Sequence, residues 1–295
     1  MAFTSGSCAD GQELQTKIKD YLTTNGWSNL KDTGLVGNNR EMLFSNPDAT
    51  INIGMLSIQN SSWLGGYLNI QLNVFDSYNS AATFYNQNGS LLTTTNYPML
   101  TCSFEPTKYW FFLNDRRMII VTYAEETYCV AYLGKFIPHG SPEQYAKPFF
   151  CGGTGYRLTD NLRASGIYSK FRNFNELCNA NYESTQFQVK NHLNAWKIST
   201  WRSSNYITCL YPSPYSFYYY NVTNNIIKAH PVQVIDGEYT LGVLDGFYGT
   251  ERIGLSAEST VIIENELGID ENYIAFPNSN KGVSDYKSYY LIKLL

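Results

Sequence analysis

The chain has 295 residues, a formal net charge of −4 and only 16% charged residues, compared with about 25% in an average soluble protein. No basic patch is present that could neutralise phosphates, which argues against direct binding of nucleic acid. No apolar run approaches the roughly 20 residues that span a bilayer, which argues against membrane insertion.

The clearest predicted helix runs from Asp10 to Thr24. Asp10 is a good N-cap residue, and Glu13, three residues later, completes a capping-box pattern. Apolar side chains recur on one face at the helical period: Leu14, Ile18, Tyr21 and Leu22. Asn25-Gly26 then supplies a left-handed stop. We therefore expect one amphipathic helix whose apolar side packs on a sheet.

After this helix the apolar period changes from 3.6 to 2, which indicates β-strands. Turn residues separate the predicted strands, which are 41–45, 51–59, 67–74, 108–113, 118–124 and 128–137. In the third strand, apolar residues alternate with Asn69, Gln71 and Asn73, which predicts an antiparallel strand with an amide-lined outer face. A helix on a mainly antiparallel sheet is an α+β architecture.

The segment 75–104 shows no clear period, although it is too long for an ordinary connection. Its aromatic residues, Tyr78, Phe84, Tyr85 and Tyr97, argue against disorder. We expect an arm or loop insertion that packs on the body of the protein or on a neighbour.

The glycine-rich run 152–155 predicts a domain boundary. Residues 1–153 would form an α+β domain with the N-terminal helix and the long loop insertion, and residues 154–295 a mainly β domain. Strand-like runs separated by short turn signals return in the second part, at 187–189, 195–200, 206–211, 217–222, 232–235, 241–244, 260–263, 273–276 and 289–294. This spacing predicts a β-sandwich or barrel-like domain.

No pattern in the sequence points to catalysis, a cofactor or a metal. The three histidines, His139, His192 and His230, have no partner at metal-ligand spacing. His139 is either a pH-sensitive contact or a structural loop residue. A carboxylate pair for glycan hydrolysis stays open, since nothing selects one pair among 25 acidic residues. Six widely spaced cysteines without a C-x-x-C motif predict buried thiols rather than a zinc site or disulfide scaffold.

Three short polar motifs read as turns. Arg116-Arg117 follows a predicted strand and is expected to be a solvated hairpin turn. Asp236-Gly237 and Asp245-Gly246 have the Asp-Gly pattern that is typical of hairpin turns between strands.

Aromatic runs are the main excess of the sequence. Residues 109–112 (Tyr-Trp-Phe-Phe) and 217–220 (Phe-Tyr-Tyr-Tyr) place aromatic side chains on both faces of a strand. Such a strand is buried between layers or lies at a subunit interface. Aromatic side chains also form sugar-binding platforms. Together with Asn69, Gln71 and Asn73 they leave a carbohydrate- or receptor-binding β module as the alternative function.

The middle of the chain carries a recurrent combination of motifs: Tyr109-Trp110-Phe111, Asn114-Asp115-Arg116-Arg117, Ile119-Ile120-Val121, Ala131-Tyr132-Leu133-Gly134, the loop 138–145, Pro148-Phe149 and Gly152-Gly153. It resembles a family of virion structural proteins of tailed bacteriophages. Leu244-Asp245-Gly246-Phe247-Tyr248 is similar to an element near the C-terminus of the same proteins. His139 and Cys151 depart from the family pattern.

The resemblance implies a multi-copy assembly protein without catalysis, located in the virion near the tail, neck or baseplate. Its partners would be other virion proteins and copies of itself, and it supplies no cofactor and no catalytic residue. The first residues lack a signal peptide, so we expect synthesis in the cytoplasm of a bacterial host. The subunit-contact candidates are Tyr109, Trp110, Pro138, His139, Pro142, Tyr145 and Phe149. In the alternative function the partner would be a host surface glycan.

Overall fold

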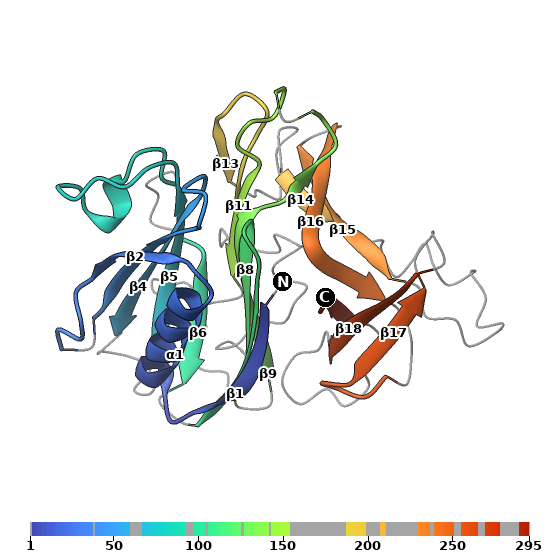
Figure 1. The fold of residues 1–295 in the computed structure, drawn as a ribbon, viewed down its shortest axis with the longest axis horizontal. Coiled ribbons are helices and arrows are strands. Elements are labelled where there is room, and N and C mark those ends of the chain that lie inside the picture. Colours follow the sequence, from blue (N-terminus) through green and yellow to red (C-terminus); the bar gives the residue numbers. More distant parts are fainter. Residues whose placement is uncertain are drawn as a thin grey trace, which may run out of the picture.

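Three antiparallel sheets stand side by side in the protein (Figure 1). The structure, a computed structural model, describes residues 2–37, 39–59, 67–91, 97–103, 106–124, 127–141, 143–153, 187–198, 207–210, 229–236, 239–250, 255–264, 269–277 and 289–294. Every strand pair in these ranges is antiparallel.

The strand order shows how the chain visits the three sheets. The first sheet has the order β2 (Ser28–Asp32), β3 (Glu41–Ser45), β4 (Asn52–Gln59), β5 (Tyr67–Phe75) and β6 (Met99–Ser103). The middle sheet has the order β1 (Ala2–Cys8), β7 (Thr107–Leu113), β8 (Arg117–Ala124), β9 (Thr127–Lys135), β11 (Phe149–Gly153), β12 (Phe187–Lys190) and β13 (Trp196–Ile198). The third sheet has the order β14 (Ile207–Leu210), β15 (His230–Asp236), β16 (Tyr239–Thr250), β19 (Tyr289–Lys293), β18 (Asp270–Pro277) and β17 (Thr260–Glu264), and β10 (Ile137–Pro138) pairs with β16.

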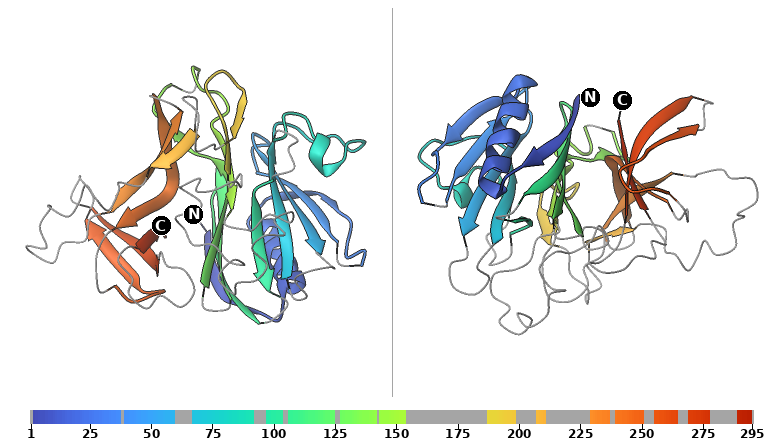
Figure 2. Two further views of the ribbon diagram at one scale, coloured as in Figure 1. Left: turned by 180° about the vertical axis from the view of Figure 1, so that it is seen from behind. Right: turned by 90° about the horizontal axis from the view of Figure 1, so that it is seen from below.

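Helix α1 (Gly11–Thr24) forms as its sequence predicts. The Asp10 carboxylate accepts hydrogen bonds from the backbone N–H groups of Gln12 and Glu13 at 2.9 and 2.8 Å, and Gly26 ends the helix at a φ of +84°. Its apolar face is buried between the first sheet and the edge of the middle sheet (Figures 1 and 2). There the Tyr21 ring lies 5.5 Å from the ring of Phe111.

The middle sheet lies between two hydrophobic cores and contributes side chains to both. Along β7, Tyr109 and Phe111 face the core between the middle sheet and the first sheet. Trp110 and Phe112 face the core between the middle sheet and the third sheet. Of the two locations predicted for this aromatic run, burial between layers is the one that the structure has. The second aromatic run, 217–220, lies outside the described residues.

The predicted antiparallel sheets and their sandwich-like arrangement are confirmed, but the fold class is mainly β rather than α+β. In the described ranges the helices are α1 and the single 3₁₀ turn η1 (Phe84–Asn86), and one helix beside three sheets does not make a helical layer. The predicted domain boundary after residue 153 falls between β11 and β12, which are hydrogen-bonded neighbours in the middle sheet. Gly152 and Gly153 belong to β11 and are buried.

Most predicted strands are present close to their predicted bounds. The sequence analysis did not predict β1, β2, β6 and β11, and β10 overlaps the predicted strand 128–137 only at Ile137. The predicted strand 217–222 lies outside the described residues. The described part of segment 75–104 packs on the body of the protein, with Phe84, Leu91 and Tyr97 buried in the core under the first sheet.

Candidate functional site

The predicted subunit-contact residues divide into buried and exposed ones. The side chains of Tyr109, Trp110, Tyr145 and Phe149 are at most 9% exposed, so they shape the interior of this chain. Pro138 is partly exposed and His139 is exposed. Pro142 lies outside the described residues. Among the described candidates, only Pro138 and His139 can therefore reach a partner directly.

Pro138 and His139 are held in place by the third sheet. Ile137 and Pro138 pair with Val243 and Gly242 of β16, and the backbone N–H of His139 donates to the Leu241 carbonyl at 3.0 Å. A side chain on Gly242 would collide with the backbone of Ile137 and Pro138, so this close approach requires glycine. The loop is thus fixed to a sheet before it reaches the surface.

Tyr145 anchors the far end of the same loop. Its hydroxyl donates to the Lys190 carbonyl at the end of β12, and its ring meets the Phe136 ring edge-on at 5.3 Å. Burial raises the pKa of the Tyr145 hydroxyl well above its usual range, so it remains a hydrogen-bond donor at neutral pH. A loop tied at both ends keeps one shape, which suits a contact surface.

The turn between β12 and β13 lies at the same end of the molecule (Figures 1 and 2). The Asn191 side-chain oxygen accepts from the backbone N–H groups of Leu193 and Ala195, at 3.1 Å in both cases, and Asn194 takes a left-handed φ of 61°. Leu193 is consequently 73% exposed. We call residues 137–141 and 192–194 together the apical surface.

The apical surface is apolar or uncharged apart from its two histidines. Ile137 is 41% exposed, and His139 and His192 are both exposed. The sequence analysis singled out the loop 138–145 through the resemblance stated there, and it placed Ile137 in a predicted strand. It missed Leu193, although the Asn-His-Leu-Asn run is a readable turn signal.

A buried polar cluster around Arg117 joins the middle and third sheets. The Arg117 side chain has no exposed surface. Its Nε donates to the Asp245 carbonyl at 2.9 Å and its Nη1 to the Phe112 carbonyl at 3.2 Å. The Asp245 carboxylate accepts from Asn114 Nδ2 at 2.9 Å, and the Tyr132 hydroxyl accepts from the Asp245 N–H at 3.1 Å.

One turn prediction is confirmed in part and another is wrong. The predicted hairpin turn is present between β7 and β8, at residues 114–116. Arg117 is buried rather than solvated, because it reaches across the interface between two sheets to carbonyl groups that need a donor. Asp245 and Gly246 lie inside β16 instead of in a hairpin turn, and Gly246 has a φ of +71° beside the guanidinium. The other Asp-Gly motif does lie where β15 meets its antiparallel neighbour β16, although residues 237–238 are outside the described ranges.

Burial lowers the pKa of Arg117, while Tyr132 and Asp245 act in the opposite direction. The guanidinium stays charged, since its ordinary pKa is far above neutral. The junction brings together the Asn114–Arg117 turn and the Leu244–Tyr248 segment. The sequence analysis singled out both segments, and in space they form one structural joint.

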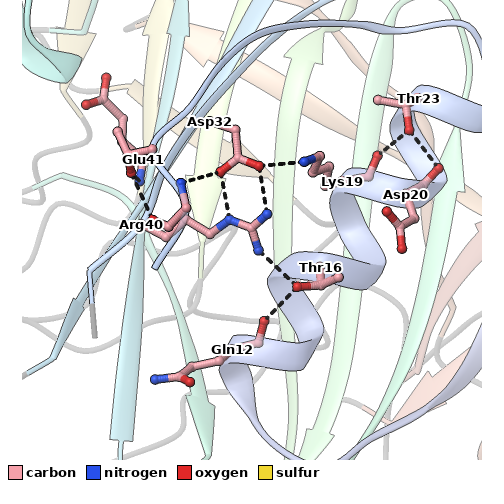
Figure 3. Close-up of polar contacts among 10 residues, drawn as sticks. Gln12, Thr16, Lys19, Asp20, Thr23, Asp32, Arg40 and Glu41 are labelled. Carbon is pink, nitrogen blue, oxygen red and sulfur yellow. Dashed lines mark hydrogen bonds and ion pairs between the residues drawn. The ribbon is translucent and has the colours of Figure 1, made fainter. Parts of the chain in front are cut away.

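Another polar network, around Asp32 and Arg40, fixes α1 to the first sheet (Figure 3). Arg40 binds Asp32 through two hydrogen bonds of 2.9 and 2.8 Å, and Lys19 of the helix reaches the same carboxylate at 2.7 Å. Arg40 also donates to the Thr16 hydroxyl at 2.9 Å. The Arg40 hydrogen bonds, assisted by Lys19, hold the pKa of Asp32 well below its usual range against the effect of partial burial.

The described part of the amide row of β5, Gln71 and Asn73, does not form an exposed platform. Asn73 is fully buried and donates to the Phe84 carbonyl at 2.7 Å. Gln71 is 9% exposed and accepts from the Tyr85 hydroxyl at 2.6 Å, while the side chain of Asn69 is outside the described part. The arm that contains η1 covers Gln71 and Asn73, so a sugar could not stack on them in this conformation.

The described residues contain no cluster of three or more His, Cys, Asp or Glu side chains that could hold a metal ion. Nor does any helix in these ranges have the length and apolarity needed to cross a membrane. Four cysteines, Cys8, Cys102, Cys129 and Cys151, are buried thiols as predicted, and burial raises the pKa of Cys8 to about 11. The side chains of Cys178 and Cys209 lie outside the described part.

No protein-family model matches the chain, and no curated protein matches it.

Proposed function

We propose that this chain is a multi-copy structural component of a tailed-phage virion, in the tail, neck or baseplate region, and that it acts through shape and contact surfaces without catalysis. Its partners would be other virion proteins and copies of itself, without direct binding of nucleic acid and without membrane insertion. It would be made in the cytoplasm of the bacterial host.

The observation that carries the proposal is the Arg117–Asp245 junction. Two segments that resemble the virion proteins, and that are far apart in sequence, converge there on a buried joint between sheets. Segments that build such a buried joint hold a rigid body together rather than form an active site. The apical surface supports the proposal further, because firmly anchored loops that expose Ile137 and Leu193 suit a permanent contact.

Peptide mass spectrometry on purified particles tests the location. Heads and tails are separated first, and peptides of this chain are quantified against a tail protein of known copy number. We expect several copies per particle in the tail fraction. Absence from all particle fractions would overturn the proposal.

A pair of matched substitutions tests the contact surface. Leu193→Asp places a charge on the apical surface, whereas Val36→Asp places one on a side chain that is similarly exposed, at 69%, in the β2–β3 loop. A charge buried at an interface without a partner is costly. We therefore expect Leu193→Asp to lower incorporation into particles at least tenfold and Val36→Asp to leave it unchanged. Equal incorporation of both variants would exclude the apical surface as the contact.

A further inference from the structure

Strand β1 forms an outer edge of the middle sheet. All seven of its residues pair in unbroken register with β7, from Ala2 opposite Leu113 to Cys8 opposite Thr107. Figure 2 shows β1 at the end of the sheet, with α1 to one side of it. Among the described residues, nothing pairs with its outer edge. The N–H and C=O groups that point outward from β1 are therefore available to another strand.

The sequence of β1 has none of the devices that protect an edge. Natural edge strands are shortened, bulged, or given charges or prolines, since an unprotected edge recruits other strands. β1 reads Ala-Phe-Thr-Ser-Gly-Ser-Cys, without a charge or a proline, and its register has no bulge. Its residues Ser5, Gly6 and Ser7 are exposed.

Other outer strands with described side chains are protected. β2 carries Lys31 and Asp32 and has a register shift. β17 has five residues and ends on Glu264, and β13 has three residues. In β6 the Met99 carbonyl lies so close to Gly153 of β11 that a side chain on Gly153 would collide with this carbonyl. β1 is thus longer than these strands, and unlike β2, β13 and β17 it carries no charge.

We propose that β1 pairs antiparallel with β1 of a second copy of this chain across a two-fold axis, so that two middle sheets become one continuous sheet. The inference rests on the proposed multi-copy role and adds to it the strand through which two copies meet. The apical surface would then be left for a different virion protein.

Two-fold pairing explains why the strand is uncharged. In a self-complementary contact, every side chain faces its own counterpart or a symmetric neighbour, so that any charge near the axis would meet its like. A register centred on Ser5 places Phe3 of one copy beside Ser7 of the other. Phe3 is 39% exposed, with its ring 5.1 Å from that of Phe112, and pairing would cover it.

One strand pair buries less surface than the roughly 1,200 Å² at which stable complexes begin. The isolated pair should therefore be weak and depend on concentration, and become stable only where an assembly holds the copies side by side. Association in solution must accordingly be measured at high protein concentration.

Charge exchange at Ser5 tests the pairing. Ser5→Lys and Ser5→Glu place like charges opposite each other at the two-fold axis, which opposes pairing. We expect the full-length wild type to dimerise with rising concentration in sedimentation equilibrium, and each variant alone to dimerise severalfold more weakly. An equimolar mixture of the two variants should recover association, since opposite charges then meet. A variant that is merely misfolded could not show this recovery.

Ser28→Lys, an exposed position on the protected strand β2, is the matched control and should dimerise like the wild type. A wild type that stays monomeric at every concentration, or a mixture without recovery, would overturn the pairing. Detection in tail particles without association in solution would leave the proposed function in place and remove this inference. Association in solution without detection in particles would remove the proposed function and leave the pairing of β1 in place.

Discussion

Arg117 is the residue whose environment departs most from what its sequence context indicates. It is a cation with no exposed surface, and it donates to carbonyl groups of Phe112 and Asp245 that belong to different sheets. Removing one member of such a buried polar group leaves its partners without compensation. The side chain therefore stabilises the folded protein through the partners that it satisfies.

We predict that Arg117→Met lowers the free energy of unfolding by about 3–5 kcal/mol, the usual cost of breaking a buried charged pair. Urea denaturation followed by circular dichroism measures this change. Lys197→Met, which removes a cation from a partly exposed position on β13, should have little effect. Equal small effects of both substitutions would show that the Arg117 joint does not stabilise the protein.

Gln15 presents the opposite case of a buried amide without compensation. Its side chain has no exposed surface, and neither its oxygen nor its nitrogen has a hydrogen-bond partner in the described structure. A buried polar group without a partner costs about 1–3 kcal/mol. We predict that Gln15→Met, a similar shape without the amide, raises the free energy of unfolding by about 1 kcal/mol or more.

Thermal or urea unfolding checks the Gln15 prediction. Gln12→Met, at a partly exposed position of the same helix, controls for helix propensity. A loss of stability in Gln15→Met would mean that the amide has a polar role that the fold needs.

At the scale of elements, α1 is held to the first sheet by the Asp32 network as well as by its apolar face. Because the pKa of Asp32 is lower in the folded protein than in the unfolded chain, the unfolded state binds the proton more readily. The stabilisation is therefore complete above the unfolded pKa of about 4 and is lost as the pH falls below it.

We predict that the wild type loses stability more steeply between about pH 5 and pH 2 than Asp32→Asn does, because the variant lacks the carboxylate that titrates in this range. Urea unfolding at a series of pH values measures the slope. Asp20→Asn, at an exposed position of α1, should keep the wild-type slope. Parallel curves for the wild type and Asp32→Asn would contradict the linkage.

The same scale shows which elements a sequence pattern can find. The helix and most strands have a strong period, because each buries one side or both. β1 and β2 escaped prediction because they are edge strands with exposed polar residues, and so have little hydrophobic alternation. A local sequence pattern reflects which side chains are buried, and an edge strand buries few of them.

At the scale of the whole molecule, we expect the middle sheet to join the three layers into one cooperative unit. β7 contributes Phe111 to one core and Phe112 to the other, so loss of either core removes support from the other. We predict that Phe111→Ala and Phe112→Ala each lower stability by about 3–5 kcal/mol and that both shift a single calorimetric transition.

Differential scanning calorimetry distinguishes this from independent layers. Two transitions, each moved by only one of the substitutions, would show that the layers unfold separately. Leu193→Ala, at an exposed position, should leave the transition in place.

The candidate contact surface was only partly predictable. The loop 138–145 was singled out through the resemblance stated in the sequence analysis, whereas Ile137 was placed in a predicted strand. Whether Tyr109 and Trp110 lie in a core or at an interface was open, since an aromatic strand has the same sequence pattern in both places. Tyr145 and Phe149 were predicted as subunit contacts and are buried within the chain instead. Leu193 became visible only when the Asn191 turn pointed it outward.

The amino-acid sequence by itself determined the helix and its caps, the alternating strands and the burial of the four described thiols. These follow from propensity, period and capping, which act between residues close in the chain. Only the tertiary structure decided that β1 lies beside β7, that Arg117 is buried against Asp245, and that the arm covers the amide row. Such contacts depend on complementary surfaces brought together across long loops, and no local pattern specifies which surfaces meet.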